Sequence, residues 1–267
     1  MAGQTAGAAV ASQSAASRAS AAHAAGADNE VLSVEGLNAW YGESHILHGV
    51  DFSVRKGEVV TLLGRNGSGR TTTLRAIMGL VGRRSGSIRV GGSETVRAAP
   101  HRIARLGIGY CPEERGIFST LSAEENLRLP PALRRVAGGL VGSPMPIGDL
   151  YAMFPNLKER ASSPGTRLSG GEQQMLAVAR ILRTGARLLL LDEISEGLAP
   201  VIVQKLGEVI RTLKQKGYTI VLVEQNFRFA APLADRFCVM EHGRIVKAFD
   251  QPELAGNMGM LREFLGV

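Results

Sequence analysis

The sequence has few aromatic residues, few cysteines and no long hydrophobic run. Aromatic residues make up 5% of the 267 residues, so the core must be built mainly from Leu, Val, Ile and Ala. No apolar stretch approaches the roughly 18 residues that a membrane-spanning helix needs, so any link to a membrane must go through a partner. Cys111 and Cys238 lie far apart and lack metal-ligand spacing, which favours buried, reduced thiols over a disulfide or a zinc site.

Acidic residues are fewer than basic ones. The chain has 24 Asp and Glu against 31 Lys and Arg, a formal net charge of +7. The arginines are spread along the chain, as at Arg83–Arg84 and Arg134–Arg135, rather than gathered in one block. This distribution favours a solvated basic surface, and a nucleic-acid site is not expected.

The first 29 residues also lack bulky apolar side chains. They are almost all Ala, Ser, Gly and Gln, and such a segment buries too little apolar surface to offset its chain entropy. Residues 1–29 are therefore predicted to form a disordered tail, and the alternative that the true start lies further along stays open. The segment has no charged start followed by a Leu-rich stretch, so it is not expected to be a secretory signal. One domain is predicted over residues 31–267.

Short strands alternate with helices from residue 31 onward. The predicted strands are Val31–Ala39, Val50–Arg55, Val59–Leu63, Ser87–Val90, Ile108–Cys111, Leu188–Leu191, Thr219–Val223, Phe237–Glu241 and Arg244–Ala248. The predicted helices are Thr71–Leu80, a helix opening at Ser169, and Val201–Lys214, with helix and loop over residues 121–165. This alternation predicts an α/β fold with a mostly parallel sheet. Its ligands should bind at the carboxyl ends of the strands, after Leu63, Leu191 and Val223.

A glycine-rich segment between a strand and a helix is predicted to hold phosphates. Its glycines let the backbone curl so that several N–H groups point at one anion, and the helix that follows adds its positive end. Thr71 offers a hydroxyl to Mg²⁺, and Thr72 can donate to a phosphate. An ordinary glycine-rich turn is the alternative, which the Thr-Thr pair disfavours. The predicted nucleotide-binding residues here are Gly64, Arg65, Asn66, Gly67, Ser68, Gly69, Arg70, Thr71 and Thr72.

Two carboxylates end the apolar strand at residues 188–191. Asp192 can hold Mg²⁺ through its water shell, and Glu193 can orient or deprotonate an attacking water. Burying two acids is costly unless they meet a cation or hydrogen-bond donors. A purely structural strand end is the alternative, and the phosphate loop that precedes these acids disfavours it.

A second anion site is predicted at the start of the helix that opens at Ser169. Ser169 and Glu172 have capping-box spacing, and two glycines leave the helix start open. One chain already has its phosphate loop, so this site makes sense if it closes over nucleotide bound to another subunit. An ordinary capped helix is the alternative. The residues concerned are Ser169, Gly170, Gly171, Glu172 and Gln173.

Together these motifs resemble the ATP-binding-cassette (ABC) family, over residues 31 to about 267. Gly64–Thr71 matches its Walker A loop, Leu168–Gln173 its signature, and Leu188–Glu193 its Walker B strand with the catalytic Glu193. The resemblance implies a P-loop NTPase (RecA-like) core, an antiparallel β sub-domain and an α-helical sub-domain at about 113–168. It also implies that Tyr41 stacks on adenine; the alternative is a surface tyrosine in a turn.

Four positions depart from the family pattern. Arg70 replaces Lys and keeps its charge, so nucleotide binding should survive while the effect on turnover stays open. Ile194 replaces a Pro. Glu113 stands where a metal-sensing Gln is usual, and Gln225 stands at the catalytic switch in place of His, where it can bond a γ-phosphate but carries no charge.

Three segments narrow the resemblance to one branch of the family. Pro112-Glu113, Ser195–Pro200 and Val223–Asn226 resemble the second ATP-binding subunit of branched-chain amino acid importers, with close relatives for urea and short amides. The resemblance implies ATP and Mg²⁺ as ligands. It implies a sister ABC ATPase subunit or a second copy as partner, transmembrane permease subunits and, indirectly, a periplasmic binding protein. It places the chain at the cytoplasmic face of the inner membrane.

Two alternatives stay open, and the cargo itself is not readable from an ATP-binding subunit. The first is the ATPase of a lipid or polysaccharide exporter. The second is a nucleotide-binding regulatory subunit with weak hydrolysis, which Arg70 and Gln225 favour and Glu193 disfavours.

Overall fold

The computed structural model describes residues 29–135 and 139–265, so the predicted tail lies outside the described residues except for Asn29. The chain from Val31 onward forms one compact unit. The strands are β1 (Glu30–Tyr41), β2 (Ser44–Arg55), β3 (Val59–Leu63), β4 (Arg83–Val90), β5 (Ser93–Glu94), β6 (Ile108–Cys111), β7 (Leu188–Asp192), β8 (Thr219–Glu224), β9 (Arg236–Glu241) and β10 (Arg244–Asp250). The helices are α2 (Arg70–Ile77), α3 (Pro100–Arg105), α4 (Ala123–Arg128), α5 (Ile147–Met153), α6 (Pro155–Glu159), α7 (Gly170–Leu182), α8 (Pro200–Gln215), α9 (Phe227–Ala230) and α10 (Leu254–Leu265), with short 3₁₀ turns at Gly165–Arg167 and Gln251–Glu253.

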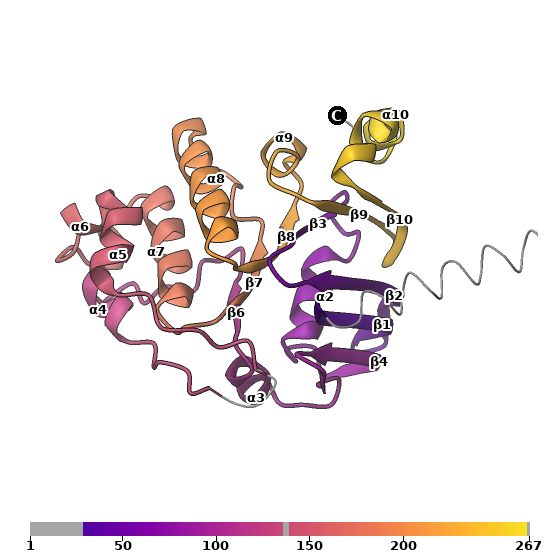
Figure 1. The fold of residues 1–267 in the computed structure, drawn as a ribbon, viewed down its shortest axis with the longest axis horizontal. Helices are drawn as coiled ribbons and strands as arrows, with labels where there is room; N and C mark the ends of the chain where they lie inside the picture. Colours follow the sequence, from indigo (N-terminus) through magenta and orange to yellow (C-terminus); the bar gives the residue numbers. More distant parts are fainter. Residues whose placement is uncertain (1–28, 136–138, 266–267) are drawn as a thin grey trace, which may run out of the picture. The chain divides into compact units, whose positions relative to one another are not determined.

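A six-stranded sheet runs through the centre of this unit in the order β10-β9-β3-β8-β7-β6 (Figure 1). The strands from β9 to β6 pair in parallel, and β10 joins β9 as the predicted antiparallel hairpin. Leu63 pairs with Glu224, and Asp192 pairs with Val223. The carboxyl ends of β3, β7 and β8 therefore meet at one edge, as expected for the ligand-binding edge of a parallel sheet. The predicted α/β fold with a mostly parallel sheet is confirmed.

The two faces of this sheet are covered by different elements. Every residue of β3, β7 and β8 is buried, as the apolar runs predicted. Because side chains alternate along a strand, Leu189 and Leu191 belong to the core shared with α7 and α8, whereas Leu188 and Leu190 belong to the core shared with α2. The helix after the phosphate loop and the helix after the signature thus lie on opposite faces of one sheet (Figure 1).

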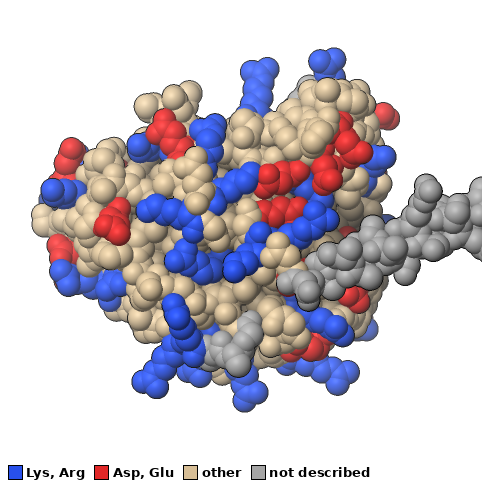
Figure 2. All heavy atoms as spheres, in the orientation of Figure 1, with Lys and Arg blue, Asp and Glu red and all other residues tan. Residues whose placement is uncertain are grey.

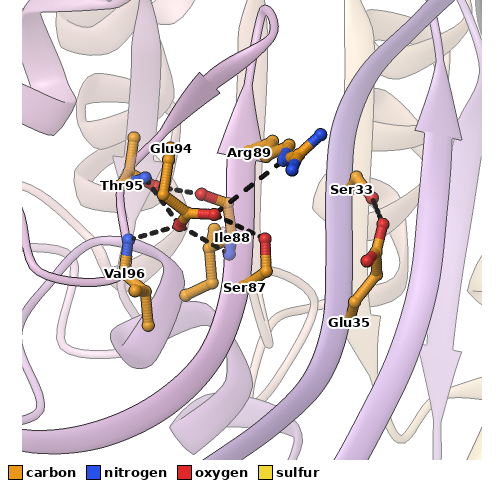
Figure 3. Close-up of polar contacts among 8 residues, drawn as sticks. All are labelled: Ser33, Glu35, Ser87, Ile88, Arg89, Glu94, Thr95 and Val96. Atoms are coloured by element: carbon orange, nitrogen blue, oxygen red, sulfur yellow. Dashed lines mark hydrogen bonds and ion pairs between the residues drawn. The ribbon is translucent and has the colours of Figure 1, made fainter.

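A second sheet, in the order β2-β1-β4-β5, forms the antiparallel region that the family resemblance implied. Its tight turn between β4 and β5 is held by one carboxylate (Figure 3). Glu94 accepts bonds from the Ser87 hydroxyl and from the backbone N–H groups of Ile88, Thr95 and Val96. Burial acts to raise the pKa of Glu94, but these donors outweigh it and lower the pKa below its ordinary value.

The helices α4, α5 and α6 pack beside α7 (Figure 1). They share its core through Leu127, Leu150, Phe154 and Leu157, all fully buried. Apart from isolated β-bridges, residues 121–135 and 139–165 are thus helix and loop, as expected. That residues 113–168 form a sub-domain of their own stays a prediction. From Val31 onward the described residues cluster as one compact unit.

Several boundaries differ from the expected ones. The helix expected to reach Leu80 ends at Ile77, because Gly79 has a φ of +74°. Strand β2 begins at Ser44 rather than Val50; its first half carries polar residues but is fixed by a stacked pair, with the rings of Trp40 and His45 4.3 Å apart. Strand β4 begins at residue 83 rather than 87, and α3 and α10 were not predicted.

The surface and the cysteines agree with expectation. Figure 2 shows Lys and Arg side chains spread over the face that it draws, with acidic side chains set among them. Cys111 and Cys238 are both buried and unpaired, and burial raises the pKa of each to about 12, so both remain thiols. Among the helices of the described residues, none combines the length and the hydrophobicity that crossing a membrane takes.

Candidate functional site

The loop between β3 and α2 has the backbone that a phosphate cradle requires. Gly67 and Gly69 have φ values of +81° and +103°, which side chains other than glycine rarely adopt. Gly64 is closely packed, since a Cβ atom there would lie 2.5 Å from the carbonyl oxygen of Met240. Helix α2 begins with neither a capping side chain nor an acidic residue in its first turn. Its first N–H groups are therefore available to an anion.

The turn of the β9–β10 hairpin is hydrogen-bonded to this loop. The backbone N–H of Gly243 donates to the carbonyl of Ser68 over 2.9 Å, and the N–H of His48 donates to the carbonyl of Gly243 over 2.9 Å. The phosphate loop is thus tied to both sheets, which keeps its curl fixed.

A hydroxyl and a phenol converge on Asp192. Thr71 Oγ1 donates to Oδ1 of Asp192 and the Tyr110 hydroxyl donates to Oδ2, each over 3.0 Å. Asp192 is fully buried, and burial raises its pKa although both donors lower it. A buried carboxylate with neutral neighbours suits a hard cation, and oxygen ligands are those that Mg²⁺ prefers. The residues at this position therefore fit a magnesium ion.

Glu113 is exposed and, with Thr71, lines the pocket at the loop between β3 and α2. Over the described ranges, no three His, Cys, Asp or Glu side chains come together as a metal site. A hydroxyl, one carboxylate, phosphate oxygens and water would make a site of a different kind.

Arg70 and Glu193 form a buried ion pair. Arg70 Nη2 lies 2.7 Å from Glu193 Oε1, and the two side chains are only 5% and 8% exposed. Burial raises the pKa of the Glu193 carboxyl, while the guanidinium and the backbone N–H of Gln225 lower it. Arg70 Nη1 and Ser68 Oγ are buried without a hydrogen-bond partner in the part of the chain that the structure describes. Both are donors that an anion could satisfy.

Arg70, Thr71 and Glu193 line one pocket of about 430 Å³, whereas Asp192 and Tyr110 are not among its lining residues. Its walls include the loop from Asn66 to Thr72 together with Tyr41, Glu113 and Glu193. Tyr41 is 44% exposed at the end of β1, so its ring is free to meet a flat ligand. Gly64 and Arg65 lie at the start of the loop and do not line this pocket.

Gln225 lines a neighbouring groove of about 920 Å³, which it shares with Glu193. The two cavities therefore meet at Glu193.

The signature segment lies apart from this pocket. Ser169 caps α7 with the predicted capping box: Glu172 N–H donates to its Oγ over 3.3 Å, and its own N–H donates to the Glu172 carboxylate over 2.7 Å. Arg115 donates to Gln173 Oε1 over 2.8 Å and lies against Gly170. No residue from 169 to 173 lines either cavity. The two helix starts that were predicted to bind anions thus share neither of these cavities within one chain.

Three side chains at the site were missed by sequence reasoning. Tyr110 contacts Asp192, and Arg115 contacts the signature helix, but neither has a motif that predicts it. Glu224 is fully buried at the end of β8, where its carboxyl accepts from the N–H of Ser195 over 3.1 Å and lies 2.7 Å from its hydroxyl. An acid that ends a buried strand is the signal that identified Asp192 and could have identified Glu224.

The buried carboxyl of Glu224 predicts a pH-dependent stability. Burial, with a smaller effect of Glu193, raises its pKa from 4.5 to about 8. Between these values the folded chain holds a proton that the unfolded chain has released, so the free energy of unfolding falls as the pH rises. Relative to a Glu224→Gln variant, wild-type stability should fall by up to about 1.4 kcal/mol per pH unit. Urea denaturation of both proteins from about pH 5 to about pH 8 measures this, and parallel curves would contradict it.

Comparison with known proteins places the chain among ATP-binding subunits. A family model described as "ABC transporter" matches residues 47–196. The high-affinity branched-chain amino acid transport ATP-binding protein BraG of Pseudomonas aeruginosa is 41% identical over 240 residues, covering 88% of this chain and all of that protein. The probable branched-chain amino acid transport ATP-binding protein LivF of Archaeoglobus fulgidus is 37% identical over 214 residues, covering 78% of this chain and 87% of that protein.

A solved structure has the same fold. The ATP-binding subunit of an ABC transporter superposes with a TM-score of 0.70 at 28% identity, over 86% of this chain and 94% of that one.

Proposed function

The chain belongs to the ABC transporter family, and from that premise we propose that it binds and hydrolyses ATP to power an importer of branched-chain amino acids or related small polar solutes. The names of BraG and LivF support the solute class. One observation carries the catalytic part. Thr71 and Asp192 lie 121 positions apart in the chain but form a hydrogen bond. Their sequence neighbours Arg70 and Glu193 form an ion pair beside it.

In this proposal the pocket holds one ATP. Tyr41 stacks on adenine, and the backbone N–H groups of the loop from Gly64 to Gly69 surround the phosphates. Arg70 supplies positive charge and a donor, Nη1, that has no hydrogen-bond partner among the described residues, and Thr72 donates a hydroxyl. Such preorganised donors stabilise charge that develops on the transferring phosphoryl group.

Magnesium would be held by Thr71 and Asp192, with Glu113 in reach through water. When bound, the ion neutralises phosphate charge and orients the terminal phosphate. Glu193 lies beside the phosphate loop, where it can orient the attacking water and take its proton. Gln225 bonds the terminal phosphate from the neighbouring groove, through an amide and without charge.

The signature is proposed to close over nucleotide in another subunit. Residues 169–173 form a helix start, capped by Ser169, that lines neither of the two cavities of its own chain. The partner is a sister ABC ATPase or a second copy, and both attach to transmembrane permease subunits fed by a periplasmic binding protein. ATP binds the closed pair more tightly than the open pair and so shifts the population toward closure. The chain then acts at the cytoplasmic face of the inner membrane.

Reconstitution tests this function. The protein, its sister ATPase and the permease pair from the same gene cluster are placed in proteoliposomes with ATP inside or outside, and uptake of labelled leucine, urea and acetamide is measured. ATP-dependent uptake of one solute supports the importer. Export of lipid with no solute uptake would support the exporter alternative. Transport without ATP turnover by this chain's own site would support the regulatory alternative.

Two serines offer a matched test of the signature. Ser169 and Ser122 each cap a helix with a complete capping box, at α7 and α4. Replacing either with Ala should cost about 1 kcal/mol of stability. Only Ser169→Ala should also lower ATP turnover, by about 10-fold or more, because only that helix start meets nucleotide across the dimer. Chemical denaturation and an ATPase assay measure both effects, and equal turnover in the two variants would contradict the signature role.

A further inference from the structure

The buried end of β8 carries a carboxyl that the proposed mechanism does not use. Glu224 is fully buried, and both of its oxygens contact a single residue, Ser195, two positions after the proposed base. We propose that Glu224 is a positioning residue that holds Glu193 toward the phosphate pocket by fixing the chain at Ser195. This inference rests on the proposed role of Glu193 in ATP hydrolysis.

Glu193 needs such support because its backbone is strained. Its φ of +49° lies in the left-handed region, which side chains other than glycine adopt at a cost. Of the described residues other than glycine, only Arg115 and His242 share a positive φ. A strained residue persists only where its surroundings determine its conformation, and such residues cluster at functional sites.

The end of β8 supplies those surroundings from three consecutive residues. On the N-terminal side of the strained residue, its own N–H donates to the carbonyl of Val223 over 2.9 Å. At its side chain, the N–H of Gln225 donates to Glu193 Oε2 over 3.2 Å. After it, Glu224 holds Ser195 by backbone and hydroxyl together. Residues 223 to 225 therefore fix the backbone before Glu193, its carboxylate, and the chain after it.

Hydrogen bonding rather than charge explains the choice of residue at position 224. A second ionised carboxylate beside Glu193 would repel the base, but burial raises the pKa of Glu224 to about 8 and so favours its neutral form. A neutral carboxyl can accept from the Ser195 N–H at one oxygen, and its other oxygen can form a hydrogen bond with the Ser195 hydroxyl in which either group donates. A glutamine has the same reach, one acceptor and a donor group. Glu224→Gln should therefore preserve the contact, whereas Glu224→Ala removes it.

The test compares steady-state ATP hydrolysis of the wild type with Glu224→Ala, Glu224→Gln and Ser195→Ala. Glu224→Ala is expected to lower kcat about 10-fold or more with KM for ATP nearly unchanged, because the base is displaced while the phosphate loop is intact. Glu224→Gln is expected to restore kcat to within about 3-fold of wild type, and Ser195→Ala to fall between the two. Thr219→Val is the matched control: it removes one part-buried hydrogen bond, which the Thr219 hydroxyl accepts from the N–H of Gly57, at the opposite end of the same strand. It should lower stability without changing kcat.

A double-mutant cycle separates positioning from general destabilisation. In a Glu193→Gln background, Glu224→Ala should lower the residual single-turnover rate little further, since the group that it positions has already been removed. An undiminished further loss would overturn the proposal, as would a Glu224→Ala variant whose kcat is unchanged or whose KM alone rises. If Glu224→Ala does not fold, Ser195→Ala provides the same cycle. A folded wild-type protein that binds ATP but hydrolyses none, even with its sister subunit, would instead overturn the proposed function.

Discussion

Glu193→Gln is expected to have the largest effect on turnover, at least about 100-fold, because it removes the proposed general base while keeping its shape. The same variant should also lower the stability of the nucleotide-free protein. The lost carboxylate is the partner of Arg70, and both side chains are almost fully buried. Removing one partner of a buried pair leaves an uncompensated charge, which costs about 3–5 kcal/mol.

The melting temperature of Glu193→Gln measured without nucleotide should therefore be lower than that of the wild type. Adding ATP should reverse the order, since the freed guanidinium can pair with phosphate and the variant does not hydrolyse what it binds. ATP bound without turnover should also hold the dimer closed, so gel filtration with ATP should show a dimer. Thermal melting with and without ATP, an ATPase assay and gel filtration measure the three effects.

Glu196→Gln is the matched control for this variant. Glu196 lines the same pocket and loses the same charge, but it is exposed and forms no ion pair within the described residues. Its turnover and melting temperature should stay near wild type. A Glu193→Gln protein that remains monomeric with ATP, or that melts like the wild type without it, would contradict the pairing and closure argued above.

The parts of the site that were predictable are those carried by contiguous residues. Apolar runs predicted β3, β7 and β8 because burial on both faces leaves no polar alternation to obscure them. The Ser169 capping box was predictable because both of its bonds span three residues. The family motifs identified the loop, the two carboxylates and the signature by local spacing alone.

The parts that were not predictable depend on which strands are neighbours. Arg70 was recognised as a departure, but its partner Glu193 lies 123 residues further along the chain, and the two meet only because β7 and β8 extend the sheet beside β3. Ser195 and Glu224 meet for the same reason. The first half of β2 was missed because its polar residues and glycine hide a strand that pairing within the second sheet stabilises. Long-range pairing of polar side chains leaves no periodic signal in a single sequence.

Asp192→Asn is the second variant for which a large effect is expected, and it should act on stability in the opposite direction to Glu193→Gln. Within the described residues Asp192 forms no ion pair; its direct partners are the neutral hydroxyls of Thr71 and Tyr110. Burial raises the pKa of both acids, but removing the charge of Asp192 leaves no buried cation without its partner, whereas removing that of Glu193 does so to Arg70. Replacing it with a neutral amide should therefore leave the protein in EDTA as stable as the wild type or more stable.

With magnesium the comparison should reverse. The wild type with ATP should gain stability on addition of Mg²⁺, and Asp192→Asn should gain little, because an amide oxygen is a weaker ligand than a carboxylate. Turnover should fall about 100-fold, the loss expected when several kcal/mol of charge stabilisation is removed.

Glu113→Gln, at the exposed side of the pocket, should need more Mg²⁺ for half-maximal turnover but keep most of its maximal rate. A Mg²⁺ titration of melting temperature and of ATPase activity measures these effects. An equal magnesium-dependent stabilisation of wild type and Asp192→Asn would contradict the role of Asp192. The two adjacent acids would thus differ in what neutralises them: Glu193 pairs with Arg70 of its own chain, and in the proposed site Asp192 would be neutralised by the magnesium ion bound with the nucleotide.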